Sequence, residues 1–484
     1  MTDKPLRLPI KLDSTSNGEF APVPLAAVER QANEAAWALT ADAAKRSGMK
    51  RRGYLASVCG AAATLFAFDE VFAKAGRTGG RYDIHPEARY DEQLAQAQVG
   101  GDEFIFDVQL HHVNPVGAWR QRPGNNARGF ELMPYARCGE SDPLACLSGQ
   151  RLLKDVFLDS DTSMAVLSHV PATEPLSPLT HEEALATKRI IDAMDGTERL
   201  LLHAPVNPRE PGSLERMQKY AESVKLAAFK TYTQFDPDPA GPGGYWLDDE
   251  QFGLPMIEQA RKLGVRNICI HKGIPLSARG VQFSGCRDVG VVAKRYPDMN
   301  FIIYHSGLQP GRGERAFDAQ RPSGIDDLVM SLQANGIAPN ANVYAELGTS
   351  WRLMMRNPEQ GAHFLGKLLK HVGENNVLWG TDSIWYGSPQ DQIQAFRAFQ
   401  IAPQLQEQQG YPALTPQLKR KVFGSNGARV YGLDEKALRP KLDKDRVRKA
   451  RMDYLPNATP DFATHGPRTR REFLVFKQTE QALS

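Results

Sequence analysis

The chain has 484 residues, and its formal net charge is +3 at pH 7 because 59 lysines and arginines nearly balance 56 aspartates and glutamates. Hydrophobic residues make up 41% of the sequence and charged residues 24%, which is typical of a soluble globular protein. This balance argues against nucleic acid or an anionic membrane surface as a partner, so a small-molecule substrate is expected. No apolar run outside the expected folded parts is long enough for stable membrane insertion.

Residues 1–100 form an N-terminal extension whose pattern differs from the rest of the chain. Within it, residues 49–76 (MKRRGYLASVCGAAATLFAFDEVFAKAG) combine paired arginines, an apolar segment of small residues, and an Ala-Lys-Ala sequence near the end. This layout is that of a twin-arginine export signal, which would place the protein in the periplasm or outside the cell.

The alternative for residues 49–76 is a helix whose apolar face packs on the main domain, in a protein that stays in the cytoplasm. The motif begins far from the N-terminus, and Asp69 and Glu70 interrupt its apolar segment. A better match to the twin-arginine pattern, TRREFLVFK at 469–477, lies at the C-terminus, where it cannot direct export. Such matches therefore arise by chance, and both interpretations stay open.

The five cysteines include no Cys-x-x-Cys pair, so the sequence predicts neither a zinc ribbon nor a disulfide framework. Cys138 and Cys146 lie close together in an expected loop and are the one plausible pair. Free thiols are the expectation for all five.

Residues 101–432 alternate short apolar runs with amphipathic helical stretches. The runs are rich in Val, Ile, Leu, Phe and Tyr with little alternation, as in strands buried on both faces of a parallel sheet. Eight strands, each followed by a helix, predict an α/β fold, a (β/α)8 TIM barrel with N-terminal and C-terminal extensions. The basic tail, 433–484, is expected to wrap the barrel or a neighbouring subunit. The expected strands are FIFDVQLH (104–111), SMAVLSHV (163–170), RLLLHAPV (199–206), AAFKTYTQF (227–235), NICIHKG (267–273), NFIIYHSG (300–307), NVYAELG (342–348) and VLWGTD (377–382).

Every expected strand ends in an ionisable or ligand-type side chain. Enzymes built on this barrel work at the C-terminal ends of the strands. A lone histidine there is more often structural than a ligand. Side chains of this kind from all eight strands at one rim indicate a functional site, and imidazoles with a carboxylate suit a divalent cation. In strand order the residues are Gln109 with His111, His169, His203, Lys230, His271, His305, Glu346 and Asp382.

Four of these strand ends carry a recognisable set of motifs: DVQLH (107–111), ICIHKG (268–273), IIYHSG (302–307) and LWGTD (378–382). Together they resemble the amidohydrolase superfamily, specifically the amidohydrolase-related branch that includes aminocarboxymuconate-semialdehyde decarboxylase. The chain departs from the family pattern at Gln109, where the family places a metal-binding histidine. An amide oxygen is a neutral and weaker ligand, so the resemblance implies a site that is altered and not abolished.

The resemblance implies roles for these residues. One divalent metal ion, with zinc the first choice and manganese or iron as alternatives, would be held by Gln109, His111, His271 and Asp382. Asp382 would also take a proton from the attacking water. His305 would polarise the scissile carbonyl or stabilise the oxyanion.

Three further residues are assigned to substrate binding, with alternatives. Lys230 is a carboxylated lysine bridging two metals, a cation that receives an anionic substrate, or half of a structural ion pair. Glu346 is an extra ligand or the partner of Lys230. Trp385 lies just beyond a strand end and suits the wall of a pocket for a flat substrate, although ordinary loop packing explains it equally well.

The leading interpretation is a metal-dependent hydrolase acting on a small organic substrate, aromatic or carboxylated. One alternative is a non-oxidative decarboxylase of an aromatic or unsaturated acid, which would use the same residues. Another is a catalytically silent barrel that binds a ligand or serves as a partner subunit, with Gln109 as the sign of decay. A homodimer is the expected assembly.

Overall fold

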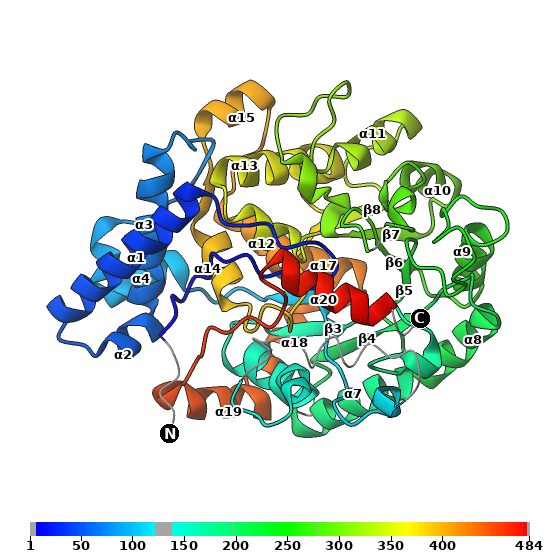
Figure 1. The fold of residues 1–484 in the computed structure, drawn as a ribbon, viewed down its shortest axis with the longest axis horizontal. Helices are drawn as coiled ribbons and strands as arrows, with labels where there is room; N and C mark the ends of the chain where they lie inside the picture. Colours follow the sequence, from blue (N-terminus) through cyan, green and yellow to red (C-terminus); the bar gives the residue numbers. More distant parts are fainter. Residues whose placement is uncertain (1–5, 122–137, 196, 277, 482–484) are drawn as a thin grey trace.

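Eight parallel strands form a barrel in the computed structural model of the chain, which describes residues 6–121, 138–195, 197–276 and 278–481. Each strand pairs with the next one along the chain. Hydrogen bonds also join the first strand to the last, because Asp382 N donates to Gln109 O at 3.0 Å and Leu110 bridges to Ser383. The predicted TIM barrel is therefore confirmed (Figure 1). The strands are β2 (Phe106–Leu110), β3 (Met164–Leu167), β4 (Leu200–Pro205), β5 (Ala228–Tyr232), β6 (Asn267–His271), β7 (Asn300–Tyr304), β8 (Val343–Glu346) and β9 (Val377–Leu378).

The strands are buried on both faces, as their continuous apolar runs predict. Alternate residues such as Val108, Val166 and Tyr304 pack together in one apolar cluster, and the intervening residues pack against the helices in others. Every side chain of β2, β5 and β6 is buried. The helices of the barrel region are α6 (Gly149–Leu152), α7 (His181–Asp195), α8 (Ser213–Ser223), α9 (Gly253–Lys262), α10 (Val289–Arg295), α11 (Asp326–Asn335), α12 (Ser350–Met354), α13 (Pro358–Lys367), α14 (Gln390–Ala398), α15 (Pro403–Gln409), α16 (Pro416–Arg420) and α17 (Asn426–Val430).

Cys138 and Cys146 form a disulfide in the loop between β2 and α6. The expectation of free thiols is wrong for this pair, because the loop brings the two Cα atoms within 5.6 Å, a separation that a disulfide can span. Cys59, Cys269 and Cys286 are free and buried.

The N-terminal helices cover one side of the barrel, on the left of Figure 1. Apolar side chains of α3, including Phe68 and Phe72, are buried in the same cluster as residues of the barrel helices. Arg51 and Arg52 begin α2 and are exposed. Among the described residues, no helix is both long and apolar enough to cross a membrane. These helices are α1 (Ala27–Arg46), α2 (Arg51–Ala56), α3 (Val58–Lys74) and α4 (Glu92–Val99), and β1 (Gly80–Tyr82) after them pairs antiparallel with β10 (Phe399–Ile401).

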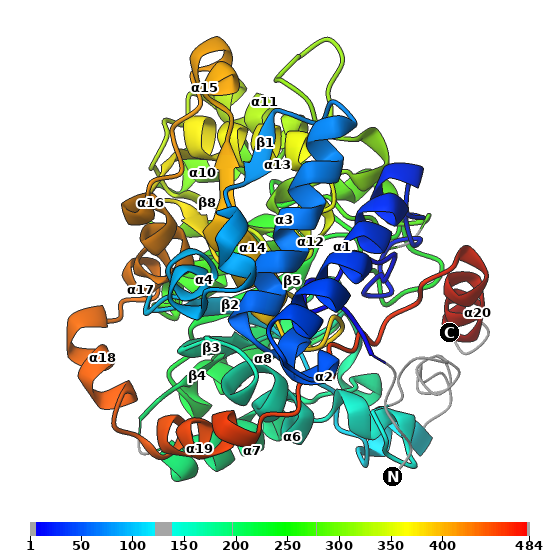
Figure 2. The same ribbon diagram turned by 90° about the vertical axis from the view of Figure 1, so that its left-hand side faces the viewer.

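Segments from both ends of the chain meet across the barrel. Ser16 N donates to Pro467 O at 2.8 Å, and the hydroxyls of Thr15 and Thr464 lie 2.9 Å apart. The tail reaches this place after running around the barrel: α18 and α19 lie on one side and α20 on another in Figure 2. Its helices are α18 (Glu435–Leu442), α19 (Arg446–Tyr454) and α20 (Arg470–Gln481).

Phe68→Ala in α3 is expected to lower the free energy of unfolding by about 3–5 kcal/mol, because the fully buried ring would leave a cavity. Glu70→Ala, on the exposed side of the same helix, is the matched control and should change it by less than about 0.5 kcal/mol. Urea unfolding of the full chain measures both. Equal stability of the two variants would contradict the packing of α3 on the barrel.

Candidate active site

Left-handed backbone conformations gather at the C-terminal ends of the last three strands. His305, Ser306, Thr349 and Asp382 have φ angles of 58°, 53°, 55° and 57°. Such conformations cost on the order of 1–3 kcal/mol each in non-glycine residues, and they persist where the surrounding structure enforces them. Their concentration at one rim supports the prediction that the functional site lies here.

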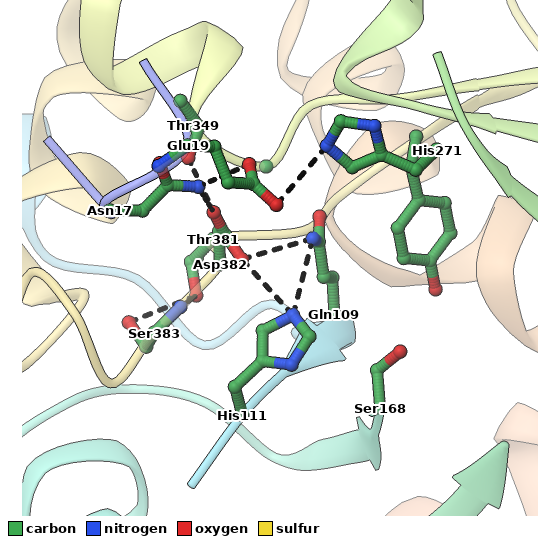
Figure 3. Close-up of polar contacts among 12 residues, drawn as sticks. Asn17, Glu19, Gln109, His111, Ser168, His271, Thr349, Thr381, Asp382 and Ser383 are labelled. Atoms are coloured by element: carbon green, nitrogen blue, oxygen red, sulfur yellow. Dashed lines mark hydrogen bonds and ion pairs between the residues drawn. The ribbon is translucent and has the colours of Figure 1, made fainter. Parts of the chain in front are cut away.

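Gln109, His111 and Asp382 form a triangle of polar atoms at this rim (Figure 3). Gln109 Nε2 lies 3.0 Å from Asp382 Oδ1 and 3.4 Å from His111 Nε2, and the last two atoms are 3.1 Å apart. All three residues are at most 2% exposed. The structure thus brings together three of the four residues predicted to bind a metal.

Asp107 fixes the backbone at two corners of this triangle, Gln109 and the loop that carries Asp382. Its carboxylate accepts hydrogen bonds from Gln109 N and Thr381 N, both at 3.1 Å, and one from the Thr381 hydroxyl. It therefore ties β2 to the loop that carries Asp382. Burial raises the pKa of Asp107 to about 7, although these hydrogen bonds oppose the shift.

The second oxygen of Asp382 is also fixed. Oδ2 accepts hydrogen bonds from Thr349 Oγ1 at 2.6 Å and from Asn17 Nδ2 at 2.8 Å. The Thr349 hydroxyl in turn lies 2.9 Å from that of Tyr386. Asp382 is held as a hydrogen-bond acceptor on both of its oxygens.

His271 and His305 lie in a second group, and their partner there is Glu19. Among the described residues, this is the one set of three or more His, Cys, Asp or Glu side chains whose ligand atoms all lie within 4.8 Å of one another. Glu19 Oε1 is 3.2 Å from His271 Nε2, and Glu19 Oε2 is 3.8 Å from His305 Nε2. The structure does not bring His271 to the Gln109 triangle, where it was expected as a ligand.

Hydrogen bonds determine which nitrogen of His305 carries the proton. His305 Nδ1 lies 2.8 Å from Gly348 O, and since a carbonyl oxygen only accepts, Nδ1 must donate. Nε2 then presents a lone pair, and burial, followed by the charge of His271, lowers the pKa of His305 to about 4. A neutral ring of this tautomer suits a base or ligand better than the expected oxyanion donor.

His271 has the opposite tautomer. Gln234 Oε1 accepts from Leu276 N at 3.0 Å, and its Nε2 donates to Ile274 O at 3.1 Å, so the amide orientation is fixed. The same Nε2 lies 3.2 Å from His271 Nδ1, which must accept. His271 Nε2 therefore carries the proton and lies 3.2 Å from Glu19 Oε1, a close polar contact without the alignment of a hydrogen bond.

Sequence reasoning missed Asn17 and Glu19. Asn17 Nδ2 donates to Glu19 Oε2 at 2.6 Å and to Asp382 Oδ2, so it bridges the two carboxylates. Burial opposes the ionisation of Glu19, but its electrostatic interactions with His271 and His305 and the hydrogen bond from Asn17 lower its pKa. No sequence signal pointed here, because the stretch DSTSNGEF (13–20) has the composition of an ordinary loop.

Lys230 and Glu346 are both buried, yet no salt bridge joins them in the described part of the chain. Lys230 Nζ has no hydrogen-bond partner and lies 3.3 Å from the ring centroid of Tyr304, and burial lowers its pKa to about 8. Glu346 accepts from Gly348 N at 2.5 Å and from His305 N at 3.1 Å, and burial raises its pKa to about 8. Glu346 thus supports His305, while Lys230 is a buried cation that lies over aromatic rings and has no ion-pair partner among the described residues.

The remaining predicted residues divide into two kinds. Trp385 belongs to the site, since its ring stacks on that of His111 with centroids 6.0 Å apart. His169 and His203 are structural: His169 bonds to Leu179 O and His203 O, and His203 bonds to the hydroxyls of Ser168 and Tyr431.

The residues of the triangle fit a divalent cation. Ligand atoms about 3 Å apart match those on one ion with bonds of roughly 2.1 Å. Gln109 Oε1 is buried without a hydrogen-bond partner. It packs against Gly348, where a side chain would not fit because its Cβ atom would lie only 2.1 Å from this oxygen. Turning the amide over would place this oxygen in the triangle as a ligand. The donor set, one imidazole, one carboxylate and one amide oxygen, is acceptable to zinc, manganese or iron.

Residues 180–433 match the family model described as Amidohydrolase. This range is just over half of the chain. The chain belongs to the amidohydrolase family. The match begins after β3, so the membership of this amidohydrolase does not depend on Gln109 or His111. Among curated proteins, none matches the sequence significantly.

Three solved structures show the breadth of the structural likeness. An uncharacterized TIM-barrel protein, Bb4693 from Bordetella bronchiseptica, has 12% identity and a TM-score of 0.43 over 68% of this chain and 98% of its own. The 5-carboxyvanillate decarboxylase LigW from Sphingomonas paucimobilis has 16% identity and a TM-score of 0.40, over 69% of this chain and 100% of its own. The dihydroorotase PyrC from Campylobacter jejuni has 14% identity and a TM-score of 0.38, over 69% of this chain and 85% of its own. Likenesses this distant do not indicate a substrate for the amidohydrolase described here.

Lys230→Met should change how stability depends on pH. Because the pKa of Lys230 falls from 10.5 to about 8 on folding, the unfolded chain holds the extra proton between these values. Wild-type stability should therefore rise relative to the variant as pH increases above 8, by at most about 1.4 kcal/mol per pH unit.

Urea unfolding of the wild type and Lys230→Met at pH 7.5, 8.5 and 9.5 measures this difference. Lys225→Met, at an exposed position just before β5, is the control and should show no such trend. A constant difference between the wild type and Lys230→Met across this range would contradict the lowered pKa of the buried Lys230.

Proposed function

We propose that this amidohydrolase is a metal-dependent hydrolase of a small organic substrate, with Gln109, His111 and Asp382 holding one divalent cation. The observation that carries the proposal is their triangle, whose polar atoms lie 3.0–3.4 Å apart in a buried site. Zinc is the first choice, and manganese and iron are alternatives. Such a cation would supply a Lewis acid that acidifies a coordinated water and polarises a carbonyl group.

Asp382 is the proposed proton acceptor for the attacking water. The hydrogen bond from Thr349 fixes the direction of its carboxylate. Asp107 and Thr381 fix the loop that carries it. This support reduces the reorganisation needed when the proton moves.

The two histidines have complementary proposed roles. His305 Nε2 presents a lone pair and is a second proton acceptor close to the substrate. His271 Nε2 presents a proton and is the donor to a substrate oxygen, the role first expected of His305. Trp385, stacked on His111, would form an apolar wall beside the reacting group.

Decarboxylation of an aromatic or unsaturated acid is the second candidate. The observation in its favour is that His271 already faces a carboxylate, that of Glu19, at 3.2 Å. In this reaction an acid must protonate the carbon as carbon dioxide leaves, and His271 is the donor available.

Metal analysis by plasma mass spectrometry, on protein purified without added metal, tests the proposed site. About one ion per chain is expected for the wild type, and a large loss for Asp382→Ala, which removes the charged ligand. Gln109→His should bind the ion more tightly, because imidazole is the stronger donor. Asp453→Ala, at an exposed position in α19, is the control and should leave metal content unchanged.

Two outcomes of that analysis would contradict the proposal. One is a wild type that stays empty after incubation with zinc, manganese and iron(II) while Gln109→His takes up metal, which would favour the silent barrel. The other is equal metal content in the wild type and Asp382→Ala. For a metal-loaded enzyme, esters, lactones and aromatic acids assayed in 18O-labelled water separate the reactions: hydrolysis places the label in the product acid, and decarboxylation releases carbon dioxide.

A further inference from the structure

The N-terminal segment 6–26 is firmly attached on either side of the site. Lys11 Nζ is buried and donates to Tyr386 O and Ser388 O, both at 2.8 Å. Asp13 forms a salt bridge with Arg352 at 2.7 Å. Beyond the site, the segment continues into α1, which begins at Ala27. These attachments hold the intervening residues over the strand ends.

Residues 14–20 between these attachments have no helix or strand. Gly18 has a φ of 93°, a conformation that glycine adopts readily. Ser16 N donates to Pro467 O of the C-terminal tail at 2.8 Å, whereas Gly18 N and Glu19 N bond within the stretch, to Ser16 Oγ and Asn17 Oδ1, both at 3.0 Å. Because the stretch is anchored on the tail and not on the eight strands, Glu19 can leave the site without disturbing the barrel.

The Glu19 side chain points from this stretch into the site (Figure 3). Its carboxylate lies 3.2 Å from His271 Nε2 and accepts a hydrogen bond from the Asn17 amide. Through these contacts, Glu19 is attached to the barrel only at the site. Glu19 is 18% exposed, whereas His271 and His305 are 0% exposed. Glu19 therefore lies between these two buried histidines and solvent.

The site around Glu19 favours an anion. His271 Nε2 presents its proton because Gln234 occupies the other ring nitrogen. Lys230 adds a buried cation without a hydrogen-bond partner in the described part of the chain, and Tyr232, whose ring lies 4.8 Å from Lys230 Nζ, stacks on His271 with ring centroids 5.0 Å apart. An anion that entered here would meet a hydrogen-bond donor and a positive charge, and in this structure Glu19 takes that place.

We propose that His271 forms a carboxylate-binding subsite, that Glu19 of the N-terminal segment fills it as an internal ligand, and that a carboxylate group of the substrate displaces Glu19 before reaction. The inference rests on the proposed function, because the subsite belongs to the same active site. It identifies the substrate as a small carboxylic acid derivative and Glu19 as its competitor.

Binding of small carboxylates to the full chain tests the inference without a known substrate. Acetate and benzoate are the probes, and acetamide and benzamide are their neutral counterparts. Isothermal titration calorimetry and the ligand-induced shift in melting temperature are measured for the wild type, Glu19→Ala and Glu19→Gln. Glu34→Gln, at an exposed position of α1 in the same extension, is the control.

Glu19→Ala should bind acetate and benzoate roughly 10- to 100-fold more tightly than the wild type, because the added carboxylate no longer competes with that of Glu19 for the proton on His271. The neutral amides should show no such gain, and Glu34→Gln should behave as the wild type. Glu19→Gln, which keeps the size of the side chain, should gain less than Glu19→Ala. Adding His271→Ala to Glu19→Ala should abolish the gain.

Three results would overturn the inference. Equal carboxylate affinity in Glu19→Ala and the wild type would show that Glu19 fills no subsite, and an equal gain for the amides would show that only space was created. Loss of metal from Glu19→Ala, when the wild type is loaded, would show that Glu19 is a metal ligand. A wild type that binds no metal contradicts the proposed function and not this inference. In that case, the calorimetric titrations with carboxylates still test whether Glu19 fills a carboxylate subsite.

Discussion

The junction between β2 and β9 is the constraint on which the site depends. Asp107 reaches across it to Thr381, and the backbone of Asp382 bonds to that of Gln109. Because these bonds close the barrel, they also bring residues from opposite ends of the barrel sequence into one triangle. A buried carboxylate surrounded by hydrogen-bond donors is a strong and directional tie. The fold and the site are thus held by the same few groups.

The barrel and its rim were predictable because they are encoded locally. Each strand is a short apolar run, and each site residue, such as His271 or Asp382, directly follows one, so the topology alone brings them to one rim. The disulfide was missed for the opposite reason. Whether Cys138 meets Cys146 depends on the path of a loop, which composition does not specify.

The finer geometry of the site was not predictable from the motifs. The tautomers of His271 and His305 depend on Gln234 and on the carbonyl of Gly348, neither of which belongs to a recognised motif. Asn17 is separated from Asp382 by 365 positions in the sequence, and its approach requires a loop to be placed by distant anchors. Periodicity and capping signals describe neighbours along the chain and contain no information on such contacts.

The meeting of the two chain ends over the barrel separates the stability of the enzyme from the opening of its site. Ser16 and Pro467 join there through a backbone hydrogen bond, outside the eight strands. Detachment of residues 14–20 alone costs a small part of the global unfolding free energy, since none of them belongs to the apolar clusters. If Glu19 leaves the site as we propose, substitutions at the junction of Ser16 and Pro467 can adjust how often the site opens, whereas a substitution of Asn17 would also remove a hydrogen bond of Asp382. At that junction, the rate of access and the chemistry can evolve independently.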